Sequence, residues 1–144
     1  MIGALWTVGV LAEIALFLRL PQLLARFPLR ALLLASFACA VVRFLAIGWG
    51  SGWLAVLVAA QLLHAFTFGA FHAASVAAVH RLFPGAVQAR GQALFSSLCY
   101  GVGGTVGSLA AGATWEALGP APSFGIGALF ALLGGALVAW KVRV

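Results

Sequence analysis

The sequence predicts an all-α integral membrane protein with about five transmembrane helices. Hydrophobic residues fill 65% of the 144 positions, charged residues fill 7%, and the mean hydropathy is +1.17. A soluble domain carries roughly 25% charged residues, so this chain has too little polar surface to cover a water-soluble fold. Apolar runs near the ~20 residues that cross ~30 Å of hydrocarbon recur along the whole chain.

The transmembrane helices are expected where these apolar runs lie, at residues 2–20, 31–49, 54–79, 92–114 and 123–140. Open strands are excluded because lipid cannot satisfy their backbone groups. Pro21 falls at the end of the first helix. The other prolines are expected in the connecting loops, where proline is common: Pro28, Pro84, Pro120 and Pro122.

Basic residues are concentrated in alternate loops. The second loop carries no charge and the fourth only Glu116, whereas the first loop, the third loop and the tail are basic, with Arg19, Arg26, Arg30, His80, Arg81, Arg90, Lys141 and Arg143. Because basic loops stay in the cytoplasm, we expect the N-terminus outside and the C-terminus inside. The net charge of +6 therefore reflects membrane anchoring, and no nucleic-acid partner is expected.

This orientation starts the chain on the outer side of the membrane with no leader to carry it there. An upstream helix would resolve the difficulty, so the chain looks like the last five helices of a six-helix unit. The partners expected from the sequence are the lipid bilayer and a missing transporter half, either in the same chain or in a separate subunit.

Three ionisable residues lie inside successive apolar segments: Glu13, Arg43 and His64. A charge at this depth costs at least a few kcal/mol, so such residues usually face a bundle interior and mark a substrate or proton path. At 1.5 Å per residue, all three lie in the outer-to-middle layer, with Glu13 roughly 18 Å from the outer end of its helix. A Glu13–Arg43 pair would remove two unpaired charges, and His64 would supply a proton-exchanging group, since the reference pKa of histidine is about 6.5. The alternative is a purely structural ion pair.

His72 follows His64 by slightly more than two helical turns, on roughly the same face, and is expected to extend the polar path. Its alternative is an interhelical hydrogen bond with no functional role. In the fourth helix, Gly103 with Gly107 and Gly104 with Ser108 form small-residue faces that let helices approach closely. These residues are expected to serve helix packing.

No nucleophile–base pair, metal-ligand spacing or phosphate-binding loop appears, so neither an enzyme, a metal site nor a cofactor is expected. Cys39 and Cys99 both lie in apolar segments and are interpreted as small apolar side chains.

Certain stretches resemble the C-terminal half of a major facilitator superfamily transporter, in the phenylpropionate permease-like group. They are Gly9–Phe17, Gln61–His72, Leu82–Gly85 and Arg90–Ser97. The resemblance covers nearly the whole chain and implies that its helices are helices 8 to 12 of twelve. Glu, Arg and His on successive helices also resemble the lactose permease arrangement, which has a further glutamate one turn after the histidine. Thr67 stands there in this sequence, so Glu13 or His72 would have to carry the proton.

From these observations, residues 1–144 are expected to form part of a secondary transporter in the cytoplasmic membrane. The resemblance implies proton-coupled movement of a small organic acid, with a nucleoside or sugar as other possible solutes. Two alternatives remain open. One is a small stand-alone scaffold or partner subunit without transport activity, and the other is a non-functional gene fragment.

Overall fold

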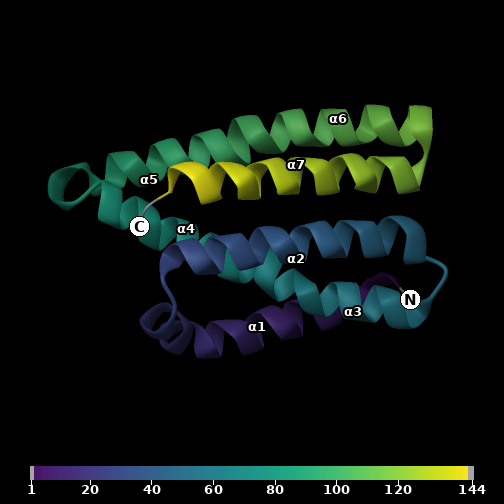
Figure 1. Cartoon of the computed structure of the whole chain (residues 1–144), viewed down its shortest axis with the longest axis horizontal. Helices are drawn as coiled ribbons and strands as arrows, with labels where there is room; N and C mark the ends of the chain where they lie inside the picture. The colour runs from purple at the N-terminus through teal and green to yellow at the C-terminus, as the bar shows by residue number, and fades with distance from the viewer. Residues whose placement is uncertain (1, 143–144) are drawn as a thin grey trace.

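The computed structural model describes residues 2–142, which form a bundle of long helices (Figure 1). The chain begins with α1 (Ile2–Arg26) and α2 (Leu29–Gly50). The third span is a continuous rod of α3 (Leu54–His64), the π-helical turn η1 (Ala65–Ala70) and α4 (Phe71–Leu82). The fourth combines the 3₁₀ turn η2 (Gly85–Val87), α5 (Gln88–Ser96), the π-helical turn η3 (Ser97–Val102) and α6 (Gly103–Leu118), and α7 (Pro120–Lys141) closes the chain.

Within the described residues, five segments are long and apolar enough to cross a membrane, which confirms the predicted fold class. Their ends extend beyond the predicted boundaries. The first helix continues through Pro21 to Arg26 instead of ending at residue 20. Arginine stems pack along apolar surface while their guanidinium groups reach water, so a helix can outlast the hydrocarbon layer.

The placement of two prolines corrects the sequence interpretation. Pro120 and Pro122 were expected in a loop, but both lie in the first turn of α7. Proline fits there because the first backbone N–H groups of a helix have no intrahelical acceptor. Gly119 precedes them with φ +83°, a conformation that glycine adopts without steric cost.

The helix α2 lies at the centre of the bundle. It packs along α7 on one side and against α3, η1 and α4 on the other, while α3 and η1 also pack against α1. Leu29, Leu32 and Leu33 of α2 bury themselves against Ala74 and Ala78 of α4. Small side chains on α4 therefore allow the two helices to approach closely.

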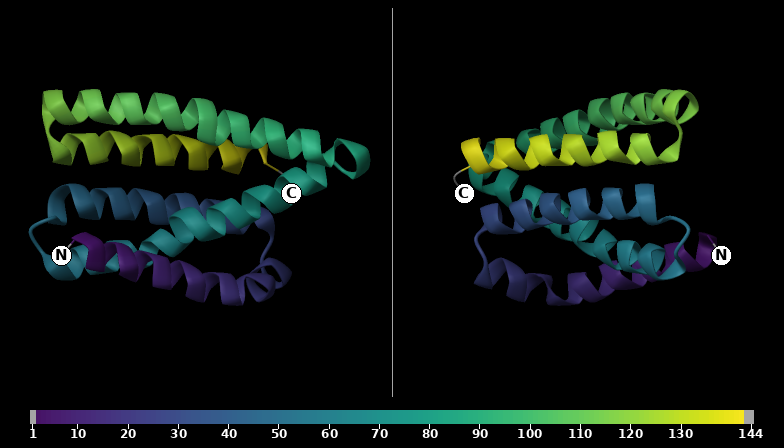
Figure 2. Two further views of the ribbon diagram at one scale, coloured as in Figure 1. Left: turned by 180° about the vertical axis from the view of Figure 1, so that it is seen from behind. Right: turned by 45° about the vertical axis from the view of Figure 1, so that its right-hand side comes forward.

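The helix α6 lies along the outer side of α7, as both views of Figure 2 show. None of its residues is buried. A Cβ added at Gly104 or Gly107 would meet no atom within 4 Å, and Ser108 is exposed. The predicted packing face of Gly103, Gly104, Gly107 and Ser108 thus has no partner helix among residues 2–142, and its packing role stays a prediction.

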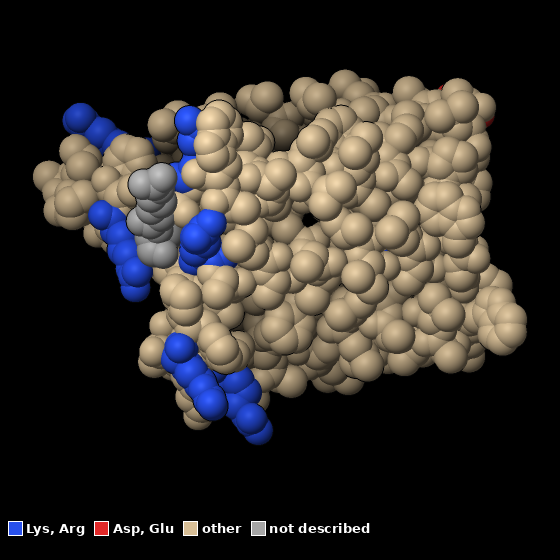
Figure 3. Space-filling model, in the orientation of Figure 1, with Lys and Arg blue, Asp and Glu red and all other residues tan. Residues whose placement is uncertain are grey.

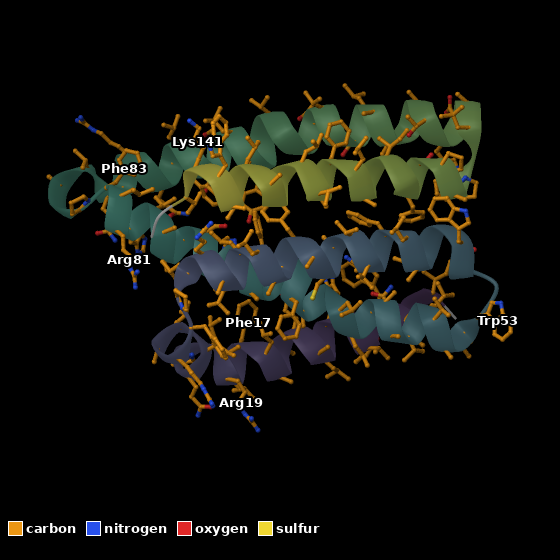
Figure 4. The ribbon with its side chains drawn as sticks, viewed as in Figure 1. Phe17, Arg19, Trp53, Arg81, Phe83 and Lys141 are labelled. Carbon is orange, nitrogen blue, oxygen red and sulfur yellow. The ribbon has the colours of Figure 1, made fainter. Side chains whose placement is uncertain are left out.

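Lysine and arginine side chains gather at one end of the bundle (Figure 3). Arg19, Arg81 and Lys141 all lie at this end, whereas Trp53 lies at the opposite one (Figure 4). The C-terminal end of the chain shares the basic end, and the N-terminal end lies at the other (Figure 1). Arg143 falls outside the described residues. The basic residues that the sequence places in alternate loops therefore lie together at one end of the structure.

Candidate substrate and proton site

Glu13 of α1 and His64 at the end of α3 face each other inside the bundle. The distance from Glu13 Oε2 to His64 Nε2 is 3.9 Å, and the two side chains are 16% and 29% exposed. This separation is at the outer limit of an ion pair, and any attraction across it requires a protonated imidazole. The pair is thus a junction between a carboxylate and a group that can exchange a proton.

Two glycines make this approach possible. A Cβ at Gly9 would lie 3.0 Å from Gln61 Oε1 and 3.6 Å from His64 Cδ2. A Cβ at Gly69 would lie 3.1 Å from Leu16 Cδ2 and 3.3 Å from Glu13 Cγ. A methyl group at either position would crowd these side chains, which would have to shift by a few tenths of an ångström, so the two glycines allow the close approach of α1 to α3 and η1.

Arg43 reaches the same region from α2 but does not pair with Glu13. Its Nη1 donates a hydrogen bond to Thr67 Oγ1 at 3.1 Å, and Thr67 Oγ1 donates to the His64 carbonyl at 3.2 Å. The ion pairs among the described residues include Glu13 with His64 and none with Arg43. Glu13 therefore does not pair with Arg43 as expected. Instead, Glu13 lies beside the His64 ring, and Thr67 links the His64 carbonyl to Arg43. The reason is geometric, since α3 and η1 pack against both α1 and α2.

The π-helical turn η1 aligns His64 with His72. His72 lies eight positions after His64, and at 3.6 residues per turn this spacing would overshoot two turns by about 80°. The wider π turn holds more residues per turn and reduces that overshoot. The rings of His64 and Phe68 are 15° from parallel at 5.6 Å, and those of Phe68 and His72 are 9° from parallel at 6.3 Å. His72 thus shares the face of His64, as the sequence predicted.

Tyr100 is a residue that the sequence interpretation missed. Its hydroxyl lies 2.7 Å from His72 Nδ1, and the two rings are 6.0 Å apart. Tyr100 belongs to η3, so a hydrogen bond joins the third and fourth spans beside their π-helical turns. It is the only tyrosine of the chain and lies within an apolar span, which was a usable signal.

The cluster retains free hydrogen-bonding capacity. Arg43 Nε and His64 Nδ1 are buried and make no hydrogen bond to any described residue. Buried polar groups are nearly always satisfied, so each unsatisfied one calls for an explanation. An anionic group held near Arg43 would supply the acceptor that Nε lacks. Among residues 2–142 no group of three potential metal ligands occurs, and both cysteines are free thiols.

An apolar cavity of about 550 Å³ adjoins the site. Its wall comes from α2, the η1–α4 region, α6 and α7, and much of the α6 contribution is small residues such as Gly103, Gly107 and Ala110. Thr67 lines the same cavity, so the Arg43–Thr67 bond lies at its edge.

The sequence of residues 1–126 matches the family described as MFS_1 like family. The chain belongs to this family. It is also similar to a curated protein named "Probable 3-phenylpropionic acid transporter" from Escherichia coli (strain K12), with 33% identity over 118 residues. No solved structure matches the chain. The family and the apolar helices indicate a multi-pass membrane protein.

The match to the relative is unequal in extent. It covers 82% of this chain but 31% of the relative, so the chain spans less than a third of that protein's length. The resemblance to a phenylpropionate permease-like transporter of this superfamily is thereby supported over most of the chain.

Proposed function

We propose that the chain is part of a proton-coupled secondary transporter that moves a small organic acid across the cytoplasmic membrane. The observation that carries this proposal is the junction of Glu13, His64, Thr67 and Arg43 inside a membrane bundle. Arg43 supplies a cation for the carboxylate of the solute, and Glu13 or His64 exchanges the coupling proton. Ionisable residues at such depth face a bundle interior or a water-filled path.

His72 extends the proposed proton path towards the basic end of the bundle. The His72 ring stacks on Phe68, which itself stacks on His64, and the hydrogen bond from His72 to Tyr100 links the path to the fourth span. Since basic segments stay in the cytoplasm, the end that carries Arg19, Arg81 and Lys141 is proposed to be cytoplasmic. The N-terminal end is then outside.

The proposal includes a second half that completes the solute path. Binding sites of such transporters lie near the membrane midplane between two repeats. The exposed α6 and the apolar cavity beside it support the need for further helices, and so does the short share of the relative that the chain covers. The missing half belongs either to the same polypeptide in its full length or to a separate subunit, and we call the assembled protein the complete transporter.

Uptake of a labelled organic acid by cells making the complete transporter tests this function. Arg43→Ala is expected to abolish uptake while the protein still reaches the membrane. Arg81→Ala is the matched control, because Arg81 is exposed at the basic end and should leave uptake unchanged. Wild-type uptake by the Arg43→Ala variant would exclude the proposed role of this residue.

The exposed face of α6 also fits the alternative of a partner subunit or scaffold without transport activity. In that case, the complete protein would show no solute-dependent uptake, and cross-linking from α6 would capture a second membrane polypeptide. Proton-coupled uptake by the assembly would exclude this alternative.

A further inference from the structure

The start of α2 meets the end of α7 at the basic end of the bundle. Val138 of α7 packs against the buried cluster that includes Leu29 of α2. Beside this contact, Arg30 Nη2 donates a hydrogen bond to the Ala139 carbonyl. Among residues 2–142, the Arg30 side chain makes this one hydrogen bond, although a guanidinium carries five N–H donors. A side chain that is already held in place therefore keeps donors for a further acceptor.

Lys141 supplies a second cation at this junction, two residues after the carbonyl that Arg30 binds. Its Nζ lies 3.9 Å from the centroid of the Trp140 ring, a cation–π contact that restricts the lysine side chain. Trp140 is 69% exposed. Tryptophan is enriched at the level of the lipid headgroups, because its ring is apolar and its N–H is polar. Trp140 therefore indicates that Arg30 and Lys141 lie at headgroup level.

The positive charge at this end has no acidic neighbour among the described residues. The chain has two acidic side chains. Glu13 faces His64 inside the bundle, and Glu116 lies near the end of α6, at the opposite end of the molecule, where α7 begins. Figure 3 accordingly shows lysine and arginine at one end and acidic side chains only at the other. A partner that neutralises these cations must come from outside residues 2–142.

The surroundings of the two cations favour a lipid over a soluble anion. Leu132 lies two turns before Ala139 and so on the same face of α7, and Leu129 lies three residues further back. These leucines are 58% and 53% exposed. A phosphate held by Arg30 and Lys141 would place its acyl chains along this apolar face. A soluble anion would use the cations alone and leave the leucines uncovered.

We propose that the junction of α2 and α7 binds an anionic phospholipid, whose phosphate is held by Arg30 and Lys141 beside Trp140. Basic sites between transmembrane helices take anionic headgroups by the same charge attraction. This site is separate from the cluster of Glu13 and His64, and it goes beyond the proposed transport, since it does not depend on which solute is carried.

Native mass spectrometry of the purified complete transporter tests the lipid site. The protein receives equal amounts of phosphatidylglycerol and phosphatidylcholine with identical acyl chains, and the lipids that stay bound after the detergent is removed are counted. We expect phosphatidylglycerol to be retained in preference to phosphatidylcholine. Arg30→Gln and Lys141→Gln should each weaken phosphatidylglycerol binding about fivefold, the factor that one basic residue near an anionic membrane surface contributes. Lys141→Gln remains informative if Arg30→Gln disturbs the junction, because Lys141 contacts the neighbouring Trp140 ring rather than another helix.

Arg19→Gln is the matched control, because it removes one positive charge from the same end of the protein. Arg19 belongs to α1 and lies on the far side of the bundle from Lys141 (Figure 4). Its removal should change phosphatidylglycerol binding by less than about twofold, since distant exposed charges are screened.

Three results would overturn the proposal. Equal weakening by all three variants would show an effect of net charge without a defined site. Retention of the two lipids in equal amounts, or of neither, would exclude selection of an anionic headgroup. Displacement of phosphatidylglycerol by inorganic phosphate at the same concentration as the lipid would show that the junction takes a soluble anion instead.

Discussion

Thr67 is the structural link between Arg43 and the rest of the site, and its removal has a calculable cost. Thr67→Val keeps the shape of the side chain but deletes the oxygen that accepts from Arg43 Nη1 at 3.1 Å. Arg43 Nε already lacks a described partner, so the guanidinium loses a further contact. Hydrogen bonds to charged groups contribute about 1.5–3 kcal/mol in soluble proteins, but interhelical bonds in a membrane average ~0.6 and reach ~1.7 kcal/mol.

The membrane values apply here, because the unfolded chain in a bilayer also finds partners. We therefore expect a coupling free energy of about 1 kcal/mol between Arg43 and Thr67. A double-mutant cycle with Arg43→Gln and Thr67→Val would measure it by reversible detergent unfolding of the complete protein. Thr7→Val serves as the control, since among residues 2–142 the hydroxyl of Thr7 bonds only to the Gly3 carbonyl in its own helix. A coupling below about 0.3 kcal/mol, or an equal coupling for Thr7, would refute the link.

Three further predictions concern the surroundings of this link. Gly69→Ala is expected to destabilise the protein by about 1 kcal/mol in the same unfolding assay, because overpacking against Leu16 and Glu13 outweighs the gain in helix propensity. Gly3→Ala, with open space around it, should be neutral or stabilising, and the reverse order would contradict the geometry. Tyr100→Phe should change the unfolding free energy by less than about 0.5 kcal/mol, because its hydrogen bond to His72 is exposed, and a loss above about 1.5 kcal/mol would show that the bond is buried in the assembled protein. Glu13→Gln should abolish accumulation of the acid against a gradient while leaving solute exchange intact. The control Glu116→Gln, at an exposed position, should alter neither accumulation nor exchange. Full accumulation by Glu13→Gln would exclude this carboxylate as the proton carrier.

The membrane spans were predictable because burial in lipid leaves a signal in every residue of a segment. Long apolar runs and the clustering of arginines in alternate connections each follow from composition, and residues 2–142 bear out the five spans. Helix ends were less predictable. Arg26 was expected in a loop because it is charged, but its long side chain lets the helix continue beyond the apolar layer.

The contacts of the site were harder to predict than its members. Glu13, Arg43 and His64 stand out as ionisable residues in apolar segments, yet nothing in their spacing tells which pairs touch. The pairing depends on the order in which helices pack, and α3 and η1 pack against both α1 and α2. The π-helical turns carry no clear sequence signal either. They bring the His72 ring onto the same face as the His64 ring and place Tyr100 beside His72. Charge identifies the candidates, and packing decides which of them meet.

The most direct test of proton-coupled acid transport is accumulation of labelled 3-phenylpropionate in proteoliposomes of the complete transporter under an imposed pH gradient. Protein-free liposomes give the passive diffusion of the acid, which is subtracted. The account predicts protein-dependent accumulation that a protonophore collapses and that Arg43→Ala lacks. Protein-dependent uptake that ignores the protonophore would contradict the coupling, and uptake equal to that of protein-free liposomes would contradict transport.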